Sequence, residues 1–379
     1  MPKTEQGKTT KNKTPLIKKI FSKPVMIVVF ILINIIVITA TAVAEFGNSK
    51  NAAELSEVKI NWWLLIPAAA CFIVALIVEV HKYIMMMREM AKGKVKLPYK
   101  HLHRVARRTV ILGKYYDCVT PASVGGQPFQ IYYMHKNSKL PSGAATTIPI
   151  IGMMSNQLGF IIVALLCFLL GSLTISNATL IATACFGLIF YAFWPALIMI
   201  ATFLPKATKE IINVFVKFLA KIHIVREPEK AIKRIEFEVD EYAKSVKRIL
   251  KTKKLFAKTI LLSVVFNSLM AMIPFFVLTA FGGEVGFLPC FVTTIAVMSA
   301  ICFVPTPGNA GAAEGTFFVV FSALSQGYVF WAMLVWRFFS YYAFILIGGI
   351  TYYSMHAERK RGGKEPDEIP ERSQKTRQD

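Results

Sequence analysis

The sequence predicts an all-α polytopic membrane protein with about six transmembrane helices and two re-entrant helical hairpins arranged as an inverted repeat. Of the 379 residues, 55% are hydrophobic, which is a high fraction for a soluble protein. The Lys and Arg residues that produce a net charge of +22 gather between long apolar runs. Two further apolar segments are each interrupted by Pro and Gly, which distinguishes them from simple spans.

Six apolar runs are long enough to cross roughly 30 Å of hydrocarbon at about 1.5 Å per helical residue. The first follows a basic segment but exceeds the roughly 7–15-residue core of a signal peptide, so we interpret it as a retained span. The six runs cover residues 25–46, 61–80, 146–170, 177–203, 259–281 and 328–353.

Positive charge follows the predicted membrane boundaries. Nearly all of the 44 Lys and Arg residues lie in residues 3–23, 82–108, 136–139, 206–258 and 359–377. Basic loops face the cytoplasm in multi-pass proteins, so both termini are expected to be cytoplasmic and the location is expected to be the cell membrane. The charge is explained by topology, and we expect no nucleic-acid partner.

The same pattern divides the chain into five regions. The middle region, which is basic and amphipathic, could pack against the underside of the protein, form a homo-oligomer contact or sense the membrane surface. The regions are a basic cytoplasmic tail (1–24), a first membrane half (25–203), cytoplasmic or interfacial helices (204–258), a second membrane half (259–355) and a disordered cytoplasmic tail (356–379).

The two interrupted segments lie near 109–134 and 289–324, and contain TPASVGGQP at 120–128 and VPTPGNAGAAEG at 304–315. Pro removes a helix hydrogen bond and Gly permits a chain reversal, so each segment should form two half-helices. The charges of the flanking loops indicate hairpins that enter from opposite faces. Such paired segments are typical of inverted-repeat transporters that bind substrate near the midplane; the alternative is a pair of kinked spanning helices.

Ionisable residues at membrane depth are costly and are therefore candidate functional residues. Lys114 and Asp117 lie three residues apart, so they could neutralise each other or contact substrate. Glu314 follows the second break and could cap a half-helix, pair with Arg337 or bind a coupled cation or proton. Arg337 lies in an aromatic helix, and its guanidinium group suits a lipid phosphate.

The first break offers uncharged candidates. Ser123, Gly125, Gly126 and Gln127 lie where a half-helix should begin, and backbone N–H groups at such a position can hold an anion.

The sequence contains no recognisable catalytic, metal or nucleotide motif. The six Cys residues form no CxxC or Cys/His cluster, so we expect no metal and no other cofactor. HExxH, GxSxG and GxxxxGK[ST] are absent, so any transport is expected to be downhill or ion-coupled.

The two break sequences, together with Arg337 in its aromatic helix, resemble the signature segments of the flippase-like family of the lysylphosphatidylglycerol synthase transmembrane region. The resemblance spans residues 20–355 and implies movement of an anionic or aminoacylated phospholipid between leaflets, in support of resistance to cationic antimicrobial peptides. It points to Gly308, Gly311 and Glu314 as well as to the double glycine.

This chain departs from the family pattern in two places. Many relatives have an acidic residue where this chain has Gln127, so charge coupling through that carboxylate is not expected. Full synthases also carry a soluble domain that transfers lysine. We do not expect such a domain in a cytoplasmic stretch of about 55 residues, so the chain could share the family's name without catalysing lysyl transfer.

Three alternatives remain open. The chain could be a membrane subunit or enzyme of phosphatidylglycerol lysyl transfer, a transporter of a polyprenyl-linked lipid, or a scaffold that presents lipid to a separate lipid-modifying enzyme.

Overall fold

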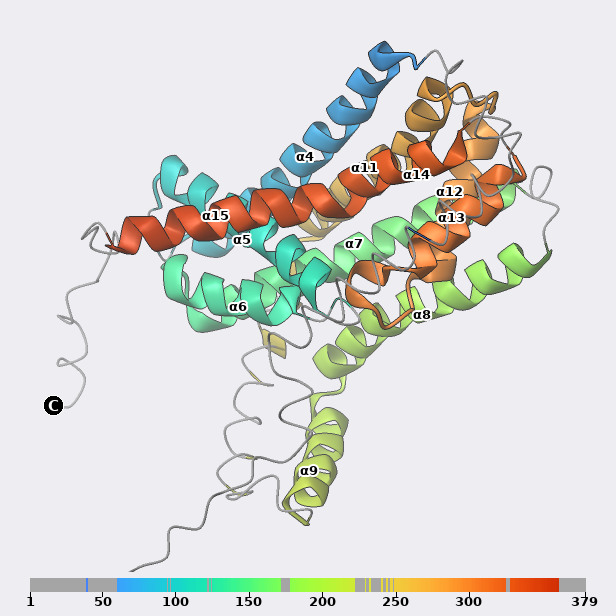
Figure 1. Cartoon of the computed structure of the whole chain (residues 1–379). Helices are drawn as coiled ribbons and strands as arrows, with labels where there is room; N and C mark the ends of the chain where they lie inside the picture. Colours follow the sequence, from blue (N-terminus) through green and yellow to red (C-terminus); the bar gives the residue numbers. More distant parts are fainter. Residues whose placement is uncertain are drawn as a thin grey trace, which may run out of the picture.

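The computed structural model is helical throughout the part of the chain that it describes (Figure 1). It describes residues 60–93, 95, 97–120, 123, 125–171, 178–221, 249–324 and 328–360, with isolated positions 39, 229, 232, 240, 243, 244, 246 and 247. The predicted first span, 25–46, and both tails fall essentially outside these residues.

Five helices in the described ranges are long and apolar enough to cross a membrane, and they confirm five of the six predicted spans. The last of them contains a π-helical turn, η4 (Phe338–Tyr342), between two α-helical parts. The spans are α4 (Leu65–Ala91, preceded by the 3-10 turn η1, Trp62–Leu64), α7 (Ser142–Gly171), α8 (Ala178–Phe203), α11 (Lys253–Ala280) and α14–α15 (Val329–Arg337 and Ala343–Lys360).

Each Pro/Gly-interrupted segment is divided into two helices at its predicted break. The first gives α5 (Tyr99–Val119) and α6 (Gly126–Asn137). The second gives α12 (Phe287–Ile301) and α13 (Ala312–Ser322), with the short 3-10 turn η3 (Pro307–Asn309) between them.

Left-handed backbone occurs at both breaks. In the first, Ser123 has φ = 52°, a value that few residues other than glycine adopt. In the second, Gly308 and Gly311 have φ = 57° and 90°, conformations that glycine reaches without steric cost. These conformations accompany the reversal of the chain in each segment, where α5 packs against α6 and α12 against α13.

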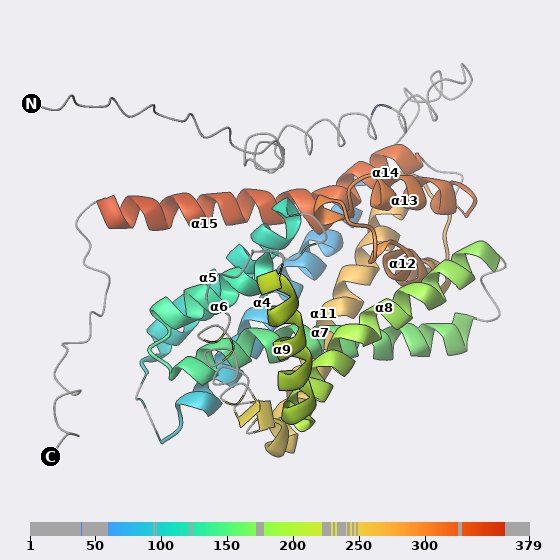
Figure 2. The ribbon, with the colours of Figure 1, turned by 90° about the horizontal axis from the view of Figure 1, so that it is seen from below.

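The two hairpins lie toward opposite ends of the helical bundle. In both views α5 and α6 lie toward one end, whereas α12 and α13 lie toward the other (Figures 1 and 2). Their breaks approach each other within the bundle, where α5 packs against η3. This is the arrangement expected of hairpins that enter from opposite faces, and the inverted repeat stays a prediction.

Small residues allow the spans to pack closely, as is common where membrane helices meet. A Cβ atom on Gly159 of α7 would lie 2.8 Å from Ser263 Cβ of α11. A Cβ atom on Gly187 of α8 would collide with the carbonyl oxygen of Ser299 in α12. These glycines set the spacing of the helices that carry the site.

The middle region is described only in part. Helix α9 (Pro205–Lys221) extends away from the bundle beyond α8 (Figure 1), and Ile211 on it is exposed. Val246 and Ile249 are buried in a cluster that includes Met86 of α4. At these two positions the chain packs against the underside of the protein, one of the three roles expected of this region.

Replacing Gly187 with Ala should destabilise the protein, because the added methyl group meets backbone that cannot rotate away. We expect a loss of about 1–3 kcal/mol in the free energy of unfolding, measured by SDS titration in detergent micelles. Gly349→Ala is the matched control, since a Cβ atom there meets nothing within 4 Å. Equal stability of the two variants would contradict the close α8–α12 contact.

Candidate functional site

A cavity of about 470 Å3, lined by both charged and apolar side chains, lies where the two breaks meet. It adjoins a second cavity of about 270 Å3. Both are lined by Lys114, Asp117 and Ser123 from the first hairpin segment and by Asn309 from the second. The other walls of the larger cavity come mainly from α7, α8 and α11. The smaller cavity is also lined by α12, Gly308 and the α14–α15 span, including Arg337, so both halves of the bundle contribute.

Lys114 brings a positive charge to this cavity. Its Nζ atom lies 5.3 Å from the centre of the Phe266 ring, within range of a cation–π contact. No carboxylate oxygen in the described ranges lies within 4 Å of it. The direct ion pair with Asp117 that the spacing suggested is therefore not formed, although both side chains line the same cavity.

Asp117 caps the helix that follows the first break. Its Oδ1 atom accepts a hydrogen bond from the Gly126 N–H group at 3.0 Å, and the Gly125 N–H group donates to Thr120 Oγ1 at 2.9 Å. A Cβ atom on Gly126 would collide with the Asp117 carboxylate. These N–H groups, predicted to hold an external anion, therefore have internal acceptors.

The second break is organised by a buried ion pair. Arg337 Nε donates to Glu314 Oε1 at 2.6 Å, and both side chains are at least 95% buried. Glu314 Oε2 accepts from the Gly311 N–H group at 2.7 Å, so the same carboxylate caps α13. The guanidinium group also donates to the Gly308 carbonyl at 3.2 Å. Of the roles expected for Glu314, the structure contains the cap and the pair.

Tyr341 connects this pair to the first hairpin. Its ring centre lies 4.6 Å from the Arg337 guanidinium carbon, and its hydroxyl group donates to the Cys118 carbonyl at 3.2 Å. The ring occupies the space that a side chain at Gly308 would need. Gly308 is therefore required both for its backbone conformation and for this contact.

Three polar atoms at the cavities have no hydrogen-bond partner among the described residues. They are Gln127 Oε1 and Gln157 Oε1 at the larger cavity and Ser340 Oγ at the smaller one. A buried amide oxygen without a donor is costly. The cavity is therefore suited to a ligand, or to water, that supplies N–H or O–H groups.

A second buried charge cluster lies behind the cavity wall, and the sequence reasoning did not identify it. Lys82 of α4 is fully buried and forms an ion pair with Glu79 Oε2 at 2.9 Å. Lys82 Nζ also donates to Asn156 Oδ1 at 2.9 Å and to Ser263 Oγ at 3.0 Å. The cluster thus joins α4, α7 and α11.

Asn156 belongs to both sites. Its amide nitrogen donates to Glu79 Oε1 at 3.1 Å, and its side chain also lines the larger cavity. Lys82 was assigned to the basic segment 82–108, because the apolar run ends at residue 80. The structure corrects this boundary, since α4 continues to Ala91 and Lys82 is buried within it. The Glu79–Lys82 spacing of three residues is the signal that could have revealed the pair.

The described residues contain no group of three His, Cys, Asp or Glu side chains that could hold a metal ion. Cys71, Cys118, Cys167 and Cys290 are buried as free thiols.

A family model described as the lysylphosphatidylglycerol synthase TM region matches residues 25–348. No curated protein and no solved structure matches the chain.

Replacing Glu314 with Gln should strongly destabilise the protein, because Arg337 would remain charged and buried without a counter-ion. We expect a loss of about 3–5 kcal/mol in the free energy of unfolding, measured by SDS titration in micelles. Glu89→Gln provides the matched control, since its partner Lys92 has a side chain that is 70% exposed and exposed pairs contribute at most about 1 kcal/mol. Similar losses in both variants would contradict a special role for the buried pair.

Replacing Lys82 with Met should cost a similar amount, because it leaves the Glu79 carboxylate buried and unpaired. The double variant Glu79→Gln/Lys82→Met carries no charge there and should recover part of the lost stability. The same titration measures both variants. A double variant that is less stable than Lys82→Met would show that the charges themselves are not the cause.

Proposed function

We infer that this chain, which belongs to the family of the lysylphosphatidylglycerol synthase transmembrane region, is a lipid transporter. It moves a phospholipid with an anionic or aminoacylated headgroup, such as lysylphosphatidylglycerol, between the leaflets of the cell membrane. The observation that supports this most is the central cavity, which both hairpin breaks line and which contains Lys114 without a carboxylate partner in the described ranges.

The charges in the cavity suit a headgroup that carries both signs. The Lys114 ammonium group can meet the lipid phosphate, and the Asp117 carboxylate can meet the ammonium groups of a lysyl headgroup. Gln127 Oε1 and Gln157 Oε1, which have no donor among the described residues, can accept hydrogen bonds from headgroup ammonium or hydroxyl groups. Ser123, at the tip of the first hairpin, borders the same space.

The buried charges of the second hairpin have a different role in this proposal. The Arg337 charge is balanced by Glu314, so Arg337 holds the tip in place, and its side chain also lines the smaller cavity. Gly308 and Gly311 shape the same tip, while Gly125 and Gly126 shape the opposite one. The headgroup would pass between the two tips while its acyl chains stay in hydrocarbon.

Leaflet exchange of fluorescent phospholipids in proteoliposomes tests the proposal. Lys114→Gln should slow the exchange of phosphatidylglycerol by at least about tenfold, because it removes one charge-assisted hydrogen bond of about 1.5–3 kcal/mol. Asp117→Asn should slow lysylphosphatidylglycerol more than phosphatidylglycerol, since only the lysyl headgroup carries ammonium groups.

Lys206→Gln is the control, because it removes one exposed positive charge on α9 and should leave exchange unchanged. Folding of every variant is checked by the SDS titration described above. Exchange no faster than in protein-free liposomes for every lipid tested would overturn the proposal and favour a role as a scaffold for a separate lipid-modifying enzyme.

A further inference from the structure

We propose that the groove between α4 and α5 is a second, peripheral binding site for an anionic phospholipid. The groove shares no lining residue with the central cavities. The proposal depends on the chain being a membrane protein and does not require that it transports lipid.

The sequence register places complementary residues along both sides of this groove. On α4, Ile73, Ile77 and His81 follow one another at intervals of four and lie on one helical face. All three are exposed within the protein. This face therefore changes from apolar to basic toward the end of α4. The change matches that along a phospholipid, from its apolar acyl chain to its anionic headgroup.

Helix α5 repeats this pattern in the opposite chain direction. Tyr99, His103, Arg107 and Ile111 recur at intervals of four, and all four line the groove. The basic and aromatic residues lie toward the start of α5, next to the end of α4. The apolar residue Ile111 lies farther along, on the same side as the apolar part of α4.

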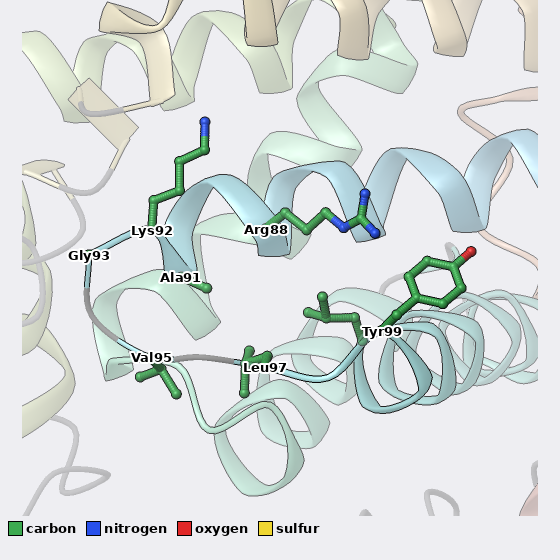
Figure 3. A pocket seen from close by; sticks show the side chains of 8 residues that line it. Arg88, Ala91, Lys92, Gly93, Val95, Leu97 and Tyr99 are labelled. Carbon is green, nitrogen blue, oxygen red and sulfur yellow. The ribbon is translucent and has the colours of Figure 1, made fainter.

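The groove consists of two adjoining cavities that share Tyr99. One, of about 320 Å3, contains the apolar residues together with His81, His103 and Arg107. The other, of about 700 Å3, is lined by Arg88 and Lys92 and by Gly93, Val95 and Leu97 between α4 and α5. Figure 3 shows Arg88 reaching toward Tyr99 across this second cavity, with its guanidinium carbon 5.1 Å from the ring centre.

The positive charges of the groove are largely uncompensated. Arg88 and Arg107 have no carboxylate within 4 Å in the ranges that the structure describes. Two neighbouring basic residues differ, since Lys92 is paired with Glu89 at 2.6 Å and Arg108 with Glu358 at 2.6 Å. These two guanidinium groups border the two adjoining cavities, Arg88 the larger and Arg107 the smaller, where each can contribute positive charge to the binding of an anionic headgroup.

The apolar part of the groove has a length suited to an acyl chain. From His81 back to Ile73 a helix rises by about 12 Å, close to the roughly 15 Å half-thickness of the bilayer hydrocarbon. A headgroup held beside His81 and Arg107, with Arg88 about two turns farther along α4, would therefore place an acyl chain along Ile77 and Ile73. Basic pockets at the ends of membrane helices are known to hold anionic headgroups in this way.

Native mass spectrometry of the delipidated protein in detergent tests the site. Phosphatidylglycerol should be retained over phosphatidylcholine with the same acyl chains. In the double variant Arg88→Gln/Arg107→Gln that retention should fall by at least about tenfold, since each basic residue near a membrane surface contributes about 1 kcal/mol.

The control Lys206→Gln/Lys217→Gln removes the same charge from exposed positions on α9 and should retain phosphatidylglycerol as the wild type does. Equal retention of phosphatidylcholine, or equal retention by Arg88→Gln/Arg107→Gln and the α9 control, would each overturn the proposal. A failure of leaflet exchange would leave these results unaffected.

Discussion

Chain breaks inside a membrane-spanning bundle impose the constraint on which the rest of this structure depends. Hydrocarbon offers no hydrogen-bond partners, so the N–H groups at the start of each half-helix must be satisfied by the protein. Asp117 does this at Gly126, and Glu314 does it at Gly311. In both cases a carboxylate lies where the helix dipole favours negative charge. Each cap introduces a charge that must then be balanced.

The two hairpins balance that charge differently. At the second, Arg337 neutralises Glu314 directly, and Tyr341 links the guanidinium group to the end of α5. At the first, Asp117 faces the cavity, and the nearby Lys114 contacts an aromatic ring instead of the carboxylate. The closed pair fixes one tip, whereas the open charges of the other tip give the cavity its capacity to bind a charged headgroup.

The five spans in the described ranges and the positions of both breaks could be predicted from hydropathy, charge distribution and the Pro/Gly segments. Spans and breaks are predictable in this way because they depend on local sequence. The choice among roles for Glu314 and Arg337 depended on tertiary packing, since 23 residues separate them. Lys82 was misplaced because a hydropathy run ends at the first charges, although a helix can continue when Glu79 and Lys82 neutralise each other. The partners Asn156 and Ser263 lie too far along the chain to be predicted.

Helix α4 shows how two adjacent residues can present a buried charge on one face and an accessible basic side chain on another. Lys82 points into the bundle and is enclosed by partners from α7 and α11. His81, its immediate neighbour, is exposed and lines the α4–α5 groove. Adjacent helical residues point about 100° apart, so the same segment can stabilise the interior and offer a basic surface to lipid. A buried basic residue at a span boundary stabilises the interior, whereas an exposed one can orient the chain in the membrane or bind lipid. The two kinds therefore have to be distinguished before the positive charge of such a chain is interpreted.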